Sequence, residues 1–277
     1  MKPKKPQAGL WAKRLNRRQV LKGLGKGLGL LGSAMAFGAP LDAARAVGSS
    51  VGAHDAPVGT RPATGEVPRR PFGRTGVEVS ALCFGGAHWG RLSDDAEAIR
   101  ILHEAIDAGV TFLDNAWEYN GGRSEELMGQ ALQGRRQQVF LMTKVCTHGR
   151  DRQAAMEQLE QSLRRLRTDY LDLWQIHEVI YEDDPDRHFA PGGAAEALLE
   201  AKKQGKVRFV GFTGHKHPAI HRKMLAKDFP FDACQMPLNV FDGTYRSFER
   251  EVLPEVNRRG IASLGMKAFS GNAEPIK

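Results

Sequence analysis

The sequence predicts an α/β protein that folds as a (β/α)8 TIM barrel, and three features of the chain carry this prediction. From residue 70 onward, short apolar runs alternate with amphipathic stretches at a period of about 30 residues. The runs are four to eight residues long and rich in β-branched or aromatic residues, as buried parallel strands are. Such alternation requires right-handed crossovers and a parallel sheet. Seven units occur, which is more than most open sheets need and close to the eight of a barrel.

The predicted elements follow one another in a regular order. A small hairpin with glycine at its turn is predicted at 70–80. Asp94 caps the first predicted helix, whose apolar residues recur at spacings of three and four, and Gly109 ends it. The predicted strands span 81–86, 111–116, 139–145, 170–177, 207–214, 231–238 and 262–269. The later helices are predicted at 124–133, 151–166, 195–204, 217–227 and 246–258.

The distribution of charge argues against a nucleic-acid-binding face. The chain has 277 residues and a formal net charge of +8, from 40 Lys and Arg against 32 Asp and Glu. Ten of the bases and one of the acids lie in residues 1–46, which leaves 30 bases and 31 acids for the rest of the chain. The folded part is therefore near neutral, and no nucleic-acid partner is expected for it.

Residues 1–46 resemble a twin-arginine signal peptide. After a basic start, the segment 16–22 (NRRQVLK) places Arg17 and Arg18 before a mildly apolar, glycine-rich stretch. That stretch is too short and too weakly apolar to cross about 30 Å of hydrocarbon, so no stable membrane span is expected. Residues 44–46 (ARA) supply a small-x-small cleavage site. We expect export through the twin-arginine machinery into the periplasm; an amphipathic N-terminal helix is the alternative.

The rest of the chain divides into a linker and a barrel. Residues 47–69 are rich in Gly, Pro, Ala and Thr and are predicted to form a flexible linker, and residues 70–277 are predicted to form the barrel. The three cysteines lie far apart and no C-x-x-C pair occurs, so neither a disulfide framework nor a zinc ribbon is expected. The only early glycine cluster is Gly85-Gly86 without a G-x-G-x-x-G pattern, which disfavours a Rossmann domain.

Two clusters of polar residues could suggest a metal site, but neither is predicted to bind a metal ion. A histidine cluster follows the pattern H-x-H-x3-H but straddles a strand-to-helix turn, so we interpret it as the start of a helix. An aspartate cluster lacks the glycine and the distal glutamate of a calcium loop and is predicted to be a solvated acidic loop. The two clusters are His215, His217 and His221, and Asp183, Asp184 and Asp186.

Four ionisable side chains follow three successive predicted strands. Asp114 and Tyr119 follow the second strand, Lys144 ends the third and His177 ends the fourth. A barrel brings the carboxyl ends of its strands around one mouth, where such groups must solvate one another. An ammonium held by a carboxylate is expected to lower the pKa of a phenol and so make it a usable proton donor. An imidazole beside it can orient a carbonyl.

These residues lie in segments that resemble the aldo-keto reductase family. The segment 109–119 (GVTFLDNAWEY) is similar to the family signature around its catalytic Asp and Tyr, and 123–132 (RSEELMGQAL) is similar to the helix that follows. Thr143-Lys144 resembles the strand with the catalytic lysine, and 162–177 resembles the approach to the catalytic histidine. The resemblance covers residues from about 70 to 270.

The resemblance implies a reaction and a role for each residue. Tyr119 would be the general acid, Lys144 and Asp114 would tune it, and His177 would position the carbonyl. The chain would reduce an aldehyde or ketone to an alcohol with hydride from NADPH, with NADH possible as a substitute, bound across the barrel mouth. The alternative is a non-catalytic truncated barrel that acts as a binding or scaffold subunit.

The resemblance also implies a cofactor shell, from which this chain departs in part. The hydroxyl of Thr213 is kept but Gly214 replaces the family's amide, and Gln235 matches a glutamine that contacts the carboxamide. Where most members place an aromatic ring under the nicotinamide, this chain has Met266 and Lys267; a thioether can pack on a ring face.

Loop residues and the chain end complete the expectations. Trp89, Trp117 and His148 follow the first three strands and are predicted to line the pocket for a small carbonyl substrate, with simple loop packing as the alternative. The sequence stops at Lys277, after the seventh strand, so the eighth strand of the family and the segment that grips the adenosine phosphate are not in it. We expect that the sequence is C-terminally truncated; coverage of the gap by another chain is the alternative.

Overall fold

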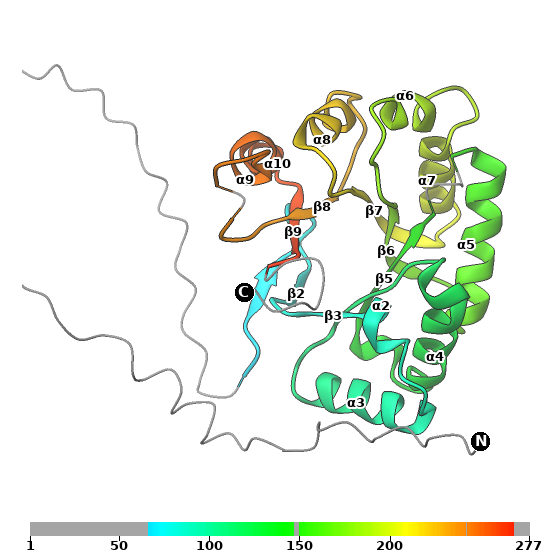
Figure 1. Ribbon diagram of the computed structural model, residues 1–277. Coiled ribbons are helices and arrows are strands. Elements are labelled where there is room, and N and C mark those ends of the chain that lie inside the picture. The colour runs from blue at the N-terminus through cyan, green and yellow to red at the C-terminus, as the bar shows by residue number, and fades with distance from the viewer. Residues whose placement is uncertain (1–65, 147–149, 242, 269–277) are drawn as a thin grey trace, which may run out of the picture. The chain divides into compact units, whose positions relative to one another are not determined.

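Seven parallel strands form one curled sheet in the computed structural model, which describes residues 66–146, 150–241 and 243–268. The strands pair in sequence order, and among the described residues β3 and β9 are the two edge strands of the sheet. Figure 1 shows the sheet curving with its helices on the outside. The strands are β3 (Cys83–Gly85), β4 (Phe112–Asp114), β5 (Phe140–Val145), β6 (Leu171–Ile176), β7 (Val207–Thr213), β8 (Ala233–Pro237) and β9 (Ala262–Met266). The prediction of an α/β barrel fold is confirmed, with all seven predicted strands present.

Helices form at each predicted place, and the short helices α2 and α6 are additional. Asp94 caps the first long helix by accepting hydrogen bonds from the backbone N–H groups of Ala96 and Glu97, at 3.0 and 3.2 Å, and Gly109, at φ +92°, follows its end. The single helix predicted at 246–258 is not formed, because the segment is divided at Val252 into two short helices. The helices are α2 (Gly86–Trp89), α3 (Asp95–Asp107), α4 (Arg123–Ala131), α5 (Arg152–Leu166), α6 (Asp184–His188), α7 (Ala194–Lys203), α8 (Pro218–Leu225), α9 (Phe248–Glu251) and α10 (Leu253–Arg258). The 3-10 helices are η1 (Tyr119–Gly122) and η2 (Arg136–Gln138).

The predicted hairpin closes one end of the sheet. Strands β1 (Arg69–Pro71) and β2 (Glu78–Ser80) pair antiparallel. Phe72, which follows β1, is 1% exposed and packs against Phe112, Phe140 and Phe209 with ring centroids 4.8–6.2 Å apart. These three rings stand at or near the amino ends of their strands. Because aromatic side chains fill that end, the carboxyl ends of the strands are left to form a site.

The interpretation of the histidine cluster as a helix start is confirmed. His217 is the N-cap of α8 and accepts a hydrogen bond from the backbone N–H of Ala219 at 3.0 Å. His221 lies on the buried face of the same helix, between the rings of Phe212 and Phe248. Within the described ranges, no group of three or more His, Cys, Asp or Glu side chains is arranged to hold a metal ion.

The prediction of a solvated acidic loop is wrong for Asp184. This residue begins α6 and is fully buried. Its Oδ2 atom accepts hydrogen bonds from the backbone N–H groups of Ile180 and Tyr181, at 2.7 and 2.8 Å, and its Oδ1 atom pairs with Arg150. Burial opposes ionisation, but these partners hold the pKa of Asp184 below its ordinary value. Arg150 lies 34 residues away, so only the fold supplies this partner.

Three regions of the prediction remain outside the described residues. The predicted signal segment 1–46 and most of the predicted linker 47–69 belong to them, as does His148. Among the described helices, none is long and apolar enough to cross a membrane.

Candidate active site

Three neighbouring strands bring the four predicted catalytic residues together. Asp114 is the last residue of β4, and Lys144 is the fifth residue of β5, the next strand in the sheet. Tyr119 begins η1, and His177 follows β6. The centroids of the Tyr119 and His177 rings are 5.7 Å apart, in an edge-to-face arrangement. The sequence therefore predicted correctly that these four side chains, called the tetrad below, meet at the carboxyl ends of the strands.

The ammonium group of Lys144 joins the cluster. It is 1% exposed, and its Nζ atom donates to a carboxylate oxygen of Asp114 and to the backbone carbonyl of Asn115, the latter at 2.7 Å. The same atom lies 3.4 Å from the hydroxyl of Tyr119. Burial favours the neutral amine, but Asp114 and Tyr119 more than offset it, so the pKa of Lys144 lies above its ordinary value. The buried ammonium therefore remains a cation beside the phenol.

The expected lowering of the pKa of Tyr119 is not what the structure gives. The charge of Lys144 does lower this pKa, but burial of the phenol and the carboxylates of Asp114 and Glu118 raise it, and its net direction is above the ordinary value. The tyrosine is therefore fully protonated at neutral pH. The ammonium limits the rise, because without it burial and the two carboxylates would act alone.

A tight turn presents Tyr119 to the cluster. The residues after it adopt positive φ values of 53° at Asn120, 66° at Gly121 and 96° at Gly122. A side chain at Gly122 would come within 2.5 Å of the guanidinium of Arg165, so the turn requires glycine there for space as well as for conformation. The turn reverses the chain directly after Tyr119 and begins α4 at once.

Glu118 belongs to this site, although the sequence assigned it no role. Its Oε1 atom is in hydrogen-bond contact with Nδ1 of His177. The signal available in the sequence was its position, directly before Tyr119 in the DNAWEY segment. Its position next to Tyr119 places the side chain of Glu118 near the carboxyl ends of the strands. Its partner His177, however, follows β6, so this contact is known only from the fold.

The predicted cofactor residues lie on three adjacent strands. Thr213 and Gln235 are partners in the register of β7 and β8 and are 2% and 7% exposed. The amide of Gln235 accepts a hydrogen bond from Gln175 at 3.1 Å and lies 3.4 Å from Asp114. Met266 ends β9 and Lys267 follows it, exposed. A hydroxyl and an amide on neighbouring strands beside Asp114 suit a nicotinamide carboxamide, so these residues fit that part of the cofactor.

Gly214 has a structural reason to be glycine. A side chain at this position would come within 2.5 Å of the carbonyl oxygen of Val179 and 2.9 Å of the ring of His221. The backbone N–H of Gly214 lies 3.3 Å from the carbonyl of Gln235. Glycine here lets the segment after β6 pass close to the end of β7. The amide side chain that the family has at this position would not fit in this packing.

Trp89 and Trp117 pack against helices. Trp89 is 6% exposed, and its indole N–H donates to the carbonyl of Ala98 in α3 at 2.9 Å. The indole N–H of Trp117 donates to Gln161 in α5 at 2.9 Å, and Arg165 stands over its ring. These contacts describe loop packing, the alternative considered for both residues, and a role in the substrate pocket stays a prediction.

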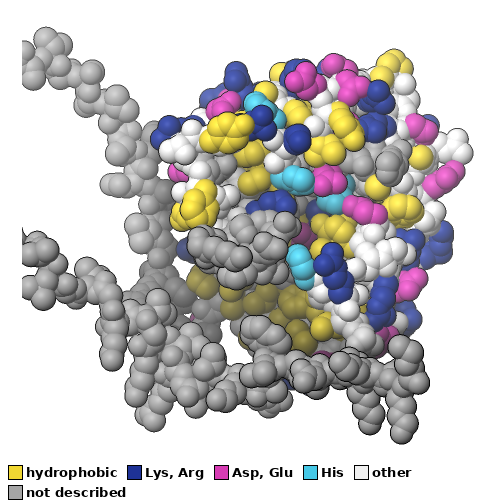
Figure 2. Space-filling model, viewed as in Figure 1, with side chains coloured by type: hydrophobic (Ala, Val, Ile, Leu, Met, Phe, Trp, Pro, Cys, Tyr) yellow, Lys and Arg dark blue, Asp and Glu magenta, His cyan; other side chains and the backbone are white. Residues whose placement is uncertain are grey.

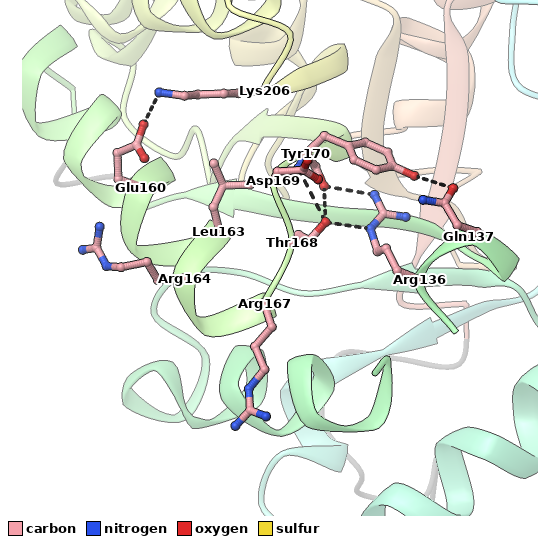
Figure 3. A pocket seen from close by; sticks show the side chains of 10 residues that line it. All are labelled: Arg136, Gln137, Glu160, Leu163, Arg164, Arg167, Thr168, Asp169, Tyr170 and Lys206. Atoms are coloured by element: carbon pink, nitrogen blue, oxygen red, sulfur yellow. Dashed lines mark hydrogen bonds and ion pairs between the residues drawn. The ribbon is translucent and has the colours of Figure 1, made fainter. Parts of the chain in front are cut away.

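A hollow of about 760 Å³ lies at the opposite end of the sheet from these residues. Its lining comes from η2, the end of α5 and the segments that lead into β6 and β7. Figure 3 shows Lys206 paired with Glu160, while Arg164 and Arg167 point away from each other. Figure 2, in contrast, shows histidine, acidic and basic side chains side by side near the middle of the face seen there. The hollow is therefore separate from the tetrad.

Comparison with known proteins assigns the family. The family model described as aldo/keto reductase matches residues 81–273, which include all four residues of the tetrad. The chain belongs to the aldo/keto reductase family. Aldo-keto reductase YhdN of Bacillus subtilis (strain 168) is 32% identical over 205 residues, which cover 69% of this chain and 58% of the relative. The oxidoreductase YqkF of the same organism is 31% identical, over 63% of this chain and 57% of the relative.

Solved structures of the family share the fold. The thermostable aldo-keto reductase Tm1743, solved with the inhibitor epalrestat, is 29% identical with a TM-score of 0.61, and 72% of each chain is covered. An aldo-keto reductase from Klebsiella pneumoniae, solved with NADPH, is 26% identical with a TM-score of 0.58, over 68% of this chain and 64% of that one. The chain thus spans less than two thirds of the length of the first curated relatives it matches.

Proposed function

We propose that this protein is an oxidoreductase that uses NADPH to reduce an aldehyde or a ketone to an alcohol. The observation that carries the proposal is the contact of one buried ammonium, that of Lys144, with both Asp114 and the hydroxyl of Tyr119. Tyr119 is a proton donor whose conjugate base has a cation in place beside it. The solved structure of a Klebsiella pneumoniae relative with NADPH supports the choice of cofactor.

The residues of the chain divide the work of the reaction. A bound nicotinamide would supply the hydride that forms the new C–H bond at the carbonyl carbon. Tyr119 gives its hydroxyl proton to the carbonyl oxygen, and the electron pair of the broken O–H bond stays on the phenolate. Lys144 stabilises that phenolate, and Asp114 keeps the lysine charged and in place. Thr213 and Gln235 would orient the carboxamide of the cofactor.

The test is an assay of the full chain with NADPH and a panel of aldehydes and ketones. We expect loss of absorbance at 340 nm that depends on both reactants, because the tetrad needs a carbonyl as proton acceptor. NADH in place of NADPH at equal concentration measures the cofactor preference, which we expect to favour NADPH. Absence of turnover with every carbonyl, together with absence of NADPH binding by fluorescence titration, would contradict the proposal.

The pH dependence of the two directions tests the role of Tyr119. Since the pKa of this residue lies above its ordinary value, the phenol keeps its proton throughout the neutral and mildly alkaline range. Reduction needs the protonated form, so its rate should hold up to about pH 10 and fall above it. Alcohol oxidation needs the phenolate, so its rate should rise as the pH increases toward and above about 10. Identical profiles for the two directions would show that another group transfers the proton.

We also propose that the protein is exported in the folded state to the periplasm by the twin-arginine route. The support is the pair Arg17 and Arg18 ahead of a weakly apolar, glycine-rich stretch and a small-x-small site. Replacement of both arginines by lysine should leave a full-length precursor in the cytoplasm. Cell fractionation with immunodetection measures this, and replacement of Lys4 and Lys5 by arginine is the control. Mature protein in the periplasm of the double-lysine variant would exclude this route.

A further inference from the structure

A buried ion pair lies behind the turn that presents Tyr119. Glu125 in α4 is fully buried, and its Oε2 atom pairs with Nη1 of Arg165 in α5 at 3.2 Å. Its Oε1 atom accepts a hydrogen bond from the hydroxyl of Thr143 in β5 at 2.6 Å. Thr143 directly precedes Lys144, so one carboxylate joins two helices to the strand that carries the lysine of the tetrad.

The guanidinium of Arg165 contacts the turn on both sides of Tyr119. Its Nη1 atom donates to the backbone carbonyl of Trp117 at 2.9 Å, and its Cζ atom lies 5.4 Å from the centroid of the Trp117 ring. On the other side of Tyr119, Gly122 leaves room for the same group, because a Cβ atom there would lie 2.5 Å from it. The chain before and after Tyr119 therefore packs on one planar, rigid group.

The backbone of the turn is also tied to β5. The N–H of Trp117 donates to the carbonyl of Lys144 at 3.2 Å, and the ammonium of Lys144 donates to the carbonyl of Asn115 at 2.7 Å. Trp117 is therefore held by β5 through its N–H and by Arg165 through its carbonyl. Since Tyr119 follows soon after, the place of its hydroxyl, 3.4 Å from the ammonium, depends on both contacts.

Stability alone does not require an ion pair at this place. Burial raises the pKa of Glu125 above its ordinary value, although Thr143 and Arg165 oppose the rise. Apolar side chains of similar volume would pack between the helices without the cost of burying charge. An ion pair with a guanidinium adds direction, because its donors lie in one plane and point at fixed acceptors, here a carboxylate and a backbone carbonyl.

We propose that Glu125 and Arg165 are positioning residues that fix the turn 117–122 against β5. The contact that they secure is that of the Tyr119 hydroxyl with the ammonium of Lys144. This inference rests on the proposed reduction of a carbonyl, in which Tyr119 gives up its proton beside that ammonium. A displacement of the hydroxyl by about 1 Å would remove the cation from the developing phenolate and lower turnover by about 10²-fold.

The first experiment measures kcat and KM for carbonyl reduction by matched variants of the full chain. Arg165→Lys keeps the charge and removes the planar fork, and Arg164→Lys makes the same change at the exposed arginine beside it. Glu125→Gln removes the charge, and Glu126→Gln is its exposed control. We expect kcat to fall by about 10- to 100-fold in Arg165→Lys and Glu125→Gln, with KM within about threefold of the parent. The two control variants should match the parent.

A triple variant separates positioning from stability. Thr143→Val, Glu125→Leu and Arg165→Met together replace the ion pair and its hydroxyl partner by apolar side chains of similar volume. We expect a melting temperature equal to that of the parent or higher, because buried ion pairs are often replaced in this way without loss. Turnover should nevertheless stay as low as in Arg165→Lys, since nothing then directs the carbonyl of Trp117.

The titration of Tyr119 is measured without cofactor or substrate. Carbon-13 NMR of chain with labelled tyrosine rings follows the phenol, and Tyr119→Phe assigns its signal. Because the charge of Lys144 lowers the pKa of Tyr119, a phenol that has moved away from the ammonium should titrate at higher pH than in the parent. We expect this rise in Arg165→Lys and in the triple variant, and none in Arg164→Lys.

Each outcome decides the inference. Parent turnover in Arg165→Lys or in the triple variant overturns it. A loss of turnover with an unchanged titration of Tyr119 overturns it as well, because the phenol would then have kept its place beside the ammonium. If a single variant does not fold, the triple variant decides, and the reverse holds too. A parent that reduces no carbonyl refutes the proposed function, whereas the titration still tests whether the pair holds Tyr119 beside Lys144.

Discussion

The two ends of the sheet handle buried charge differently. At the amino end, Asp172 in β6 is 2% exposed and uses both carboxylate oxygens. Arg136 and the backbone N–H of Leu141 donate to its Oδ2 atom, each at 2.9 Å, and Arg208 donates to its Oδ1 atom at 2.6 Å. At the carboxyl end, Asp114 pairs with Lys144 through one oxygen, and its other oxygen has an amide only at 3.4 Å.

The difference separates a structural ion-pair cluster from a reactive one. Where every oxygen has a donor at ordinary hydrogen-bond distance, a carboxylate ties strands together and has no capacity left for chemistry. Where an oxygen has only a distant donor, or none among the described residues as at Oε2 of Glu118, the group can respond to a ligand or a proton. Buried polar groups of the second kind are the more informative indication of function.

Tyr119→Phe should produce the largest effect and separate the two ends most clearly. The ring still packs against His177 but has no proton to give, so turnover should fall by about 10²-fold or more. The melting temperature and NADPH affinity should stay close to those of the parent. Initial rates, thermal unfolding and fluorescence titration measure the three quantities. A Phe variant that reduces carbonyls at the parent rate would exclude Tyr119 as the proton donor.

Asp172→Ala should lower the stability of the fold and leave turnover unchanged, the reverse of Tyr119→Phe. It removes the carboxylate that pairs with Arg136, whose side chain is 13% exposed, and leaves the N–H of Leu141 without its acceptor, which costs about 3 kcal/mol of unfolding free energy. Turnover per folded molecule should not change, because the residue lies at the other end of the sheet. Urea unfolding of this variant beside Asp169→Ala, which removes an exposed carboxylate three residues earlier, measures the effect. Equal midpoints for the two variants would show that the cluster does not stabilise the fold.

Two buried histidines predict a loss of stability in acid. Burial lowers the pKa of His188 and of His221 from 6.5 to about 4, and His188 has no hydrogen-bond partner at either ring nitrogen among the described residues. The unfolded chain binds these protons at higher pH than the folded chain, so stability present above about pH 6.5 is lost as the pH falls toward 4. Each residue contributes about 2–3 kcal/mol over that window.

The control for the acid effect is His188→Leu. This variant loses no hydrogen bond to a described residue, so its unfolding free energy should depend less steeply on pH between about 6.5 and 4 than that of the parent. Chemical denaturation at several pH values measures the slope. A slope unchanged by the substitution would show that His188 is protonated in the folded protein.

Arg100→Ala should have the smallest effect. Arg100 pairs with Glu97 and Glu104 on the exposed face of α3, where more than half of its side chain is accessible. Surface pairs of this kind are screened by water and salt, so the melting temperature should be the same as that of the parent within error. A clear decrease would mean that exposed ion pairs contribute to this fold as much as buried ones.

Local sequence patterns were sufficient to predict most helices and strands and the location of the tetrad. The seven strands begin and end within a few residues of the predictions, because an apolar run of that length is buried on both faces of a parallel sheet, here by the helices outside and by the side chains of the other strands inside. The helix predicted at 246–258 breaks at Val252, since Pro254 lacks the N–H that a continuous helix needs there. The family signature placed all four tetrad residues correctly, because strand order fixes which carboxyl ends are neighbours.

The sequence by itself determined the parallel sheet, the end at which the reactive groups gather and the identity of those groups. The tertiary structure alone decided their environment. It buried Asp184 against Arg150, paired Glu118 with His177, and surrounded Tyr119 with burial and carboxylates that outweigh the ammonium of Lys144. The physical reason is range: periodicity and capping act between residues a few positions apart, whereas the pKa of a group depends on charges and burial contributed by distant segments.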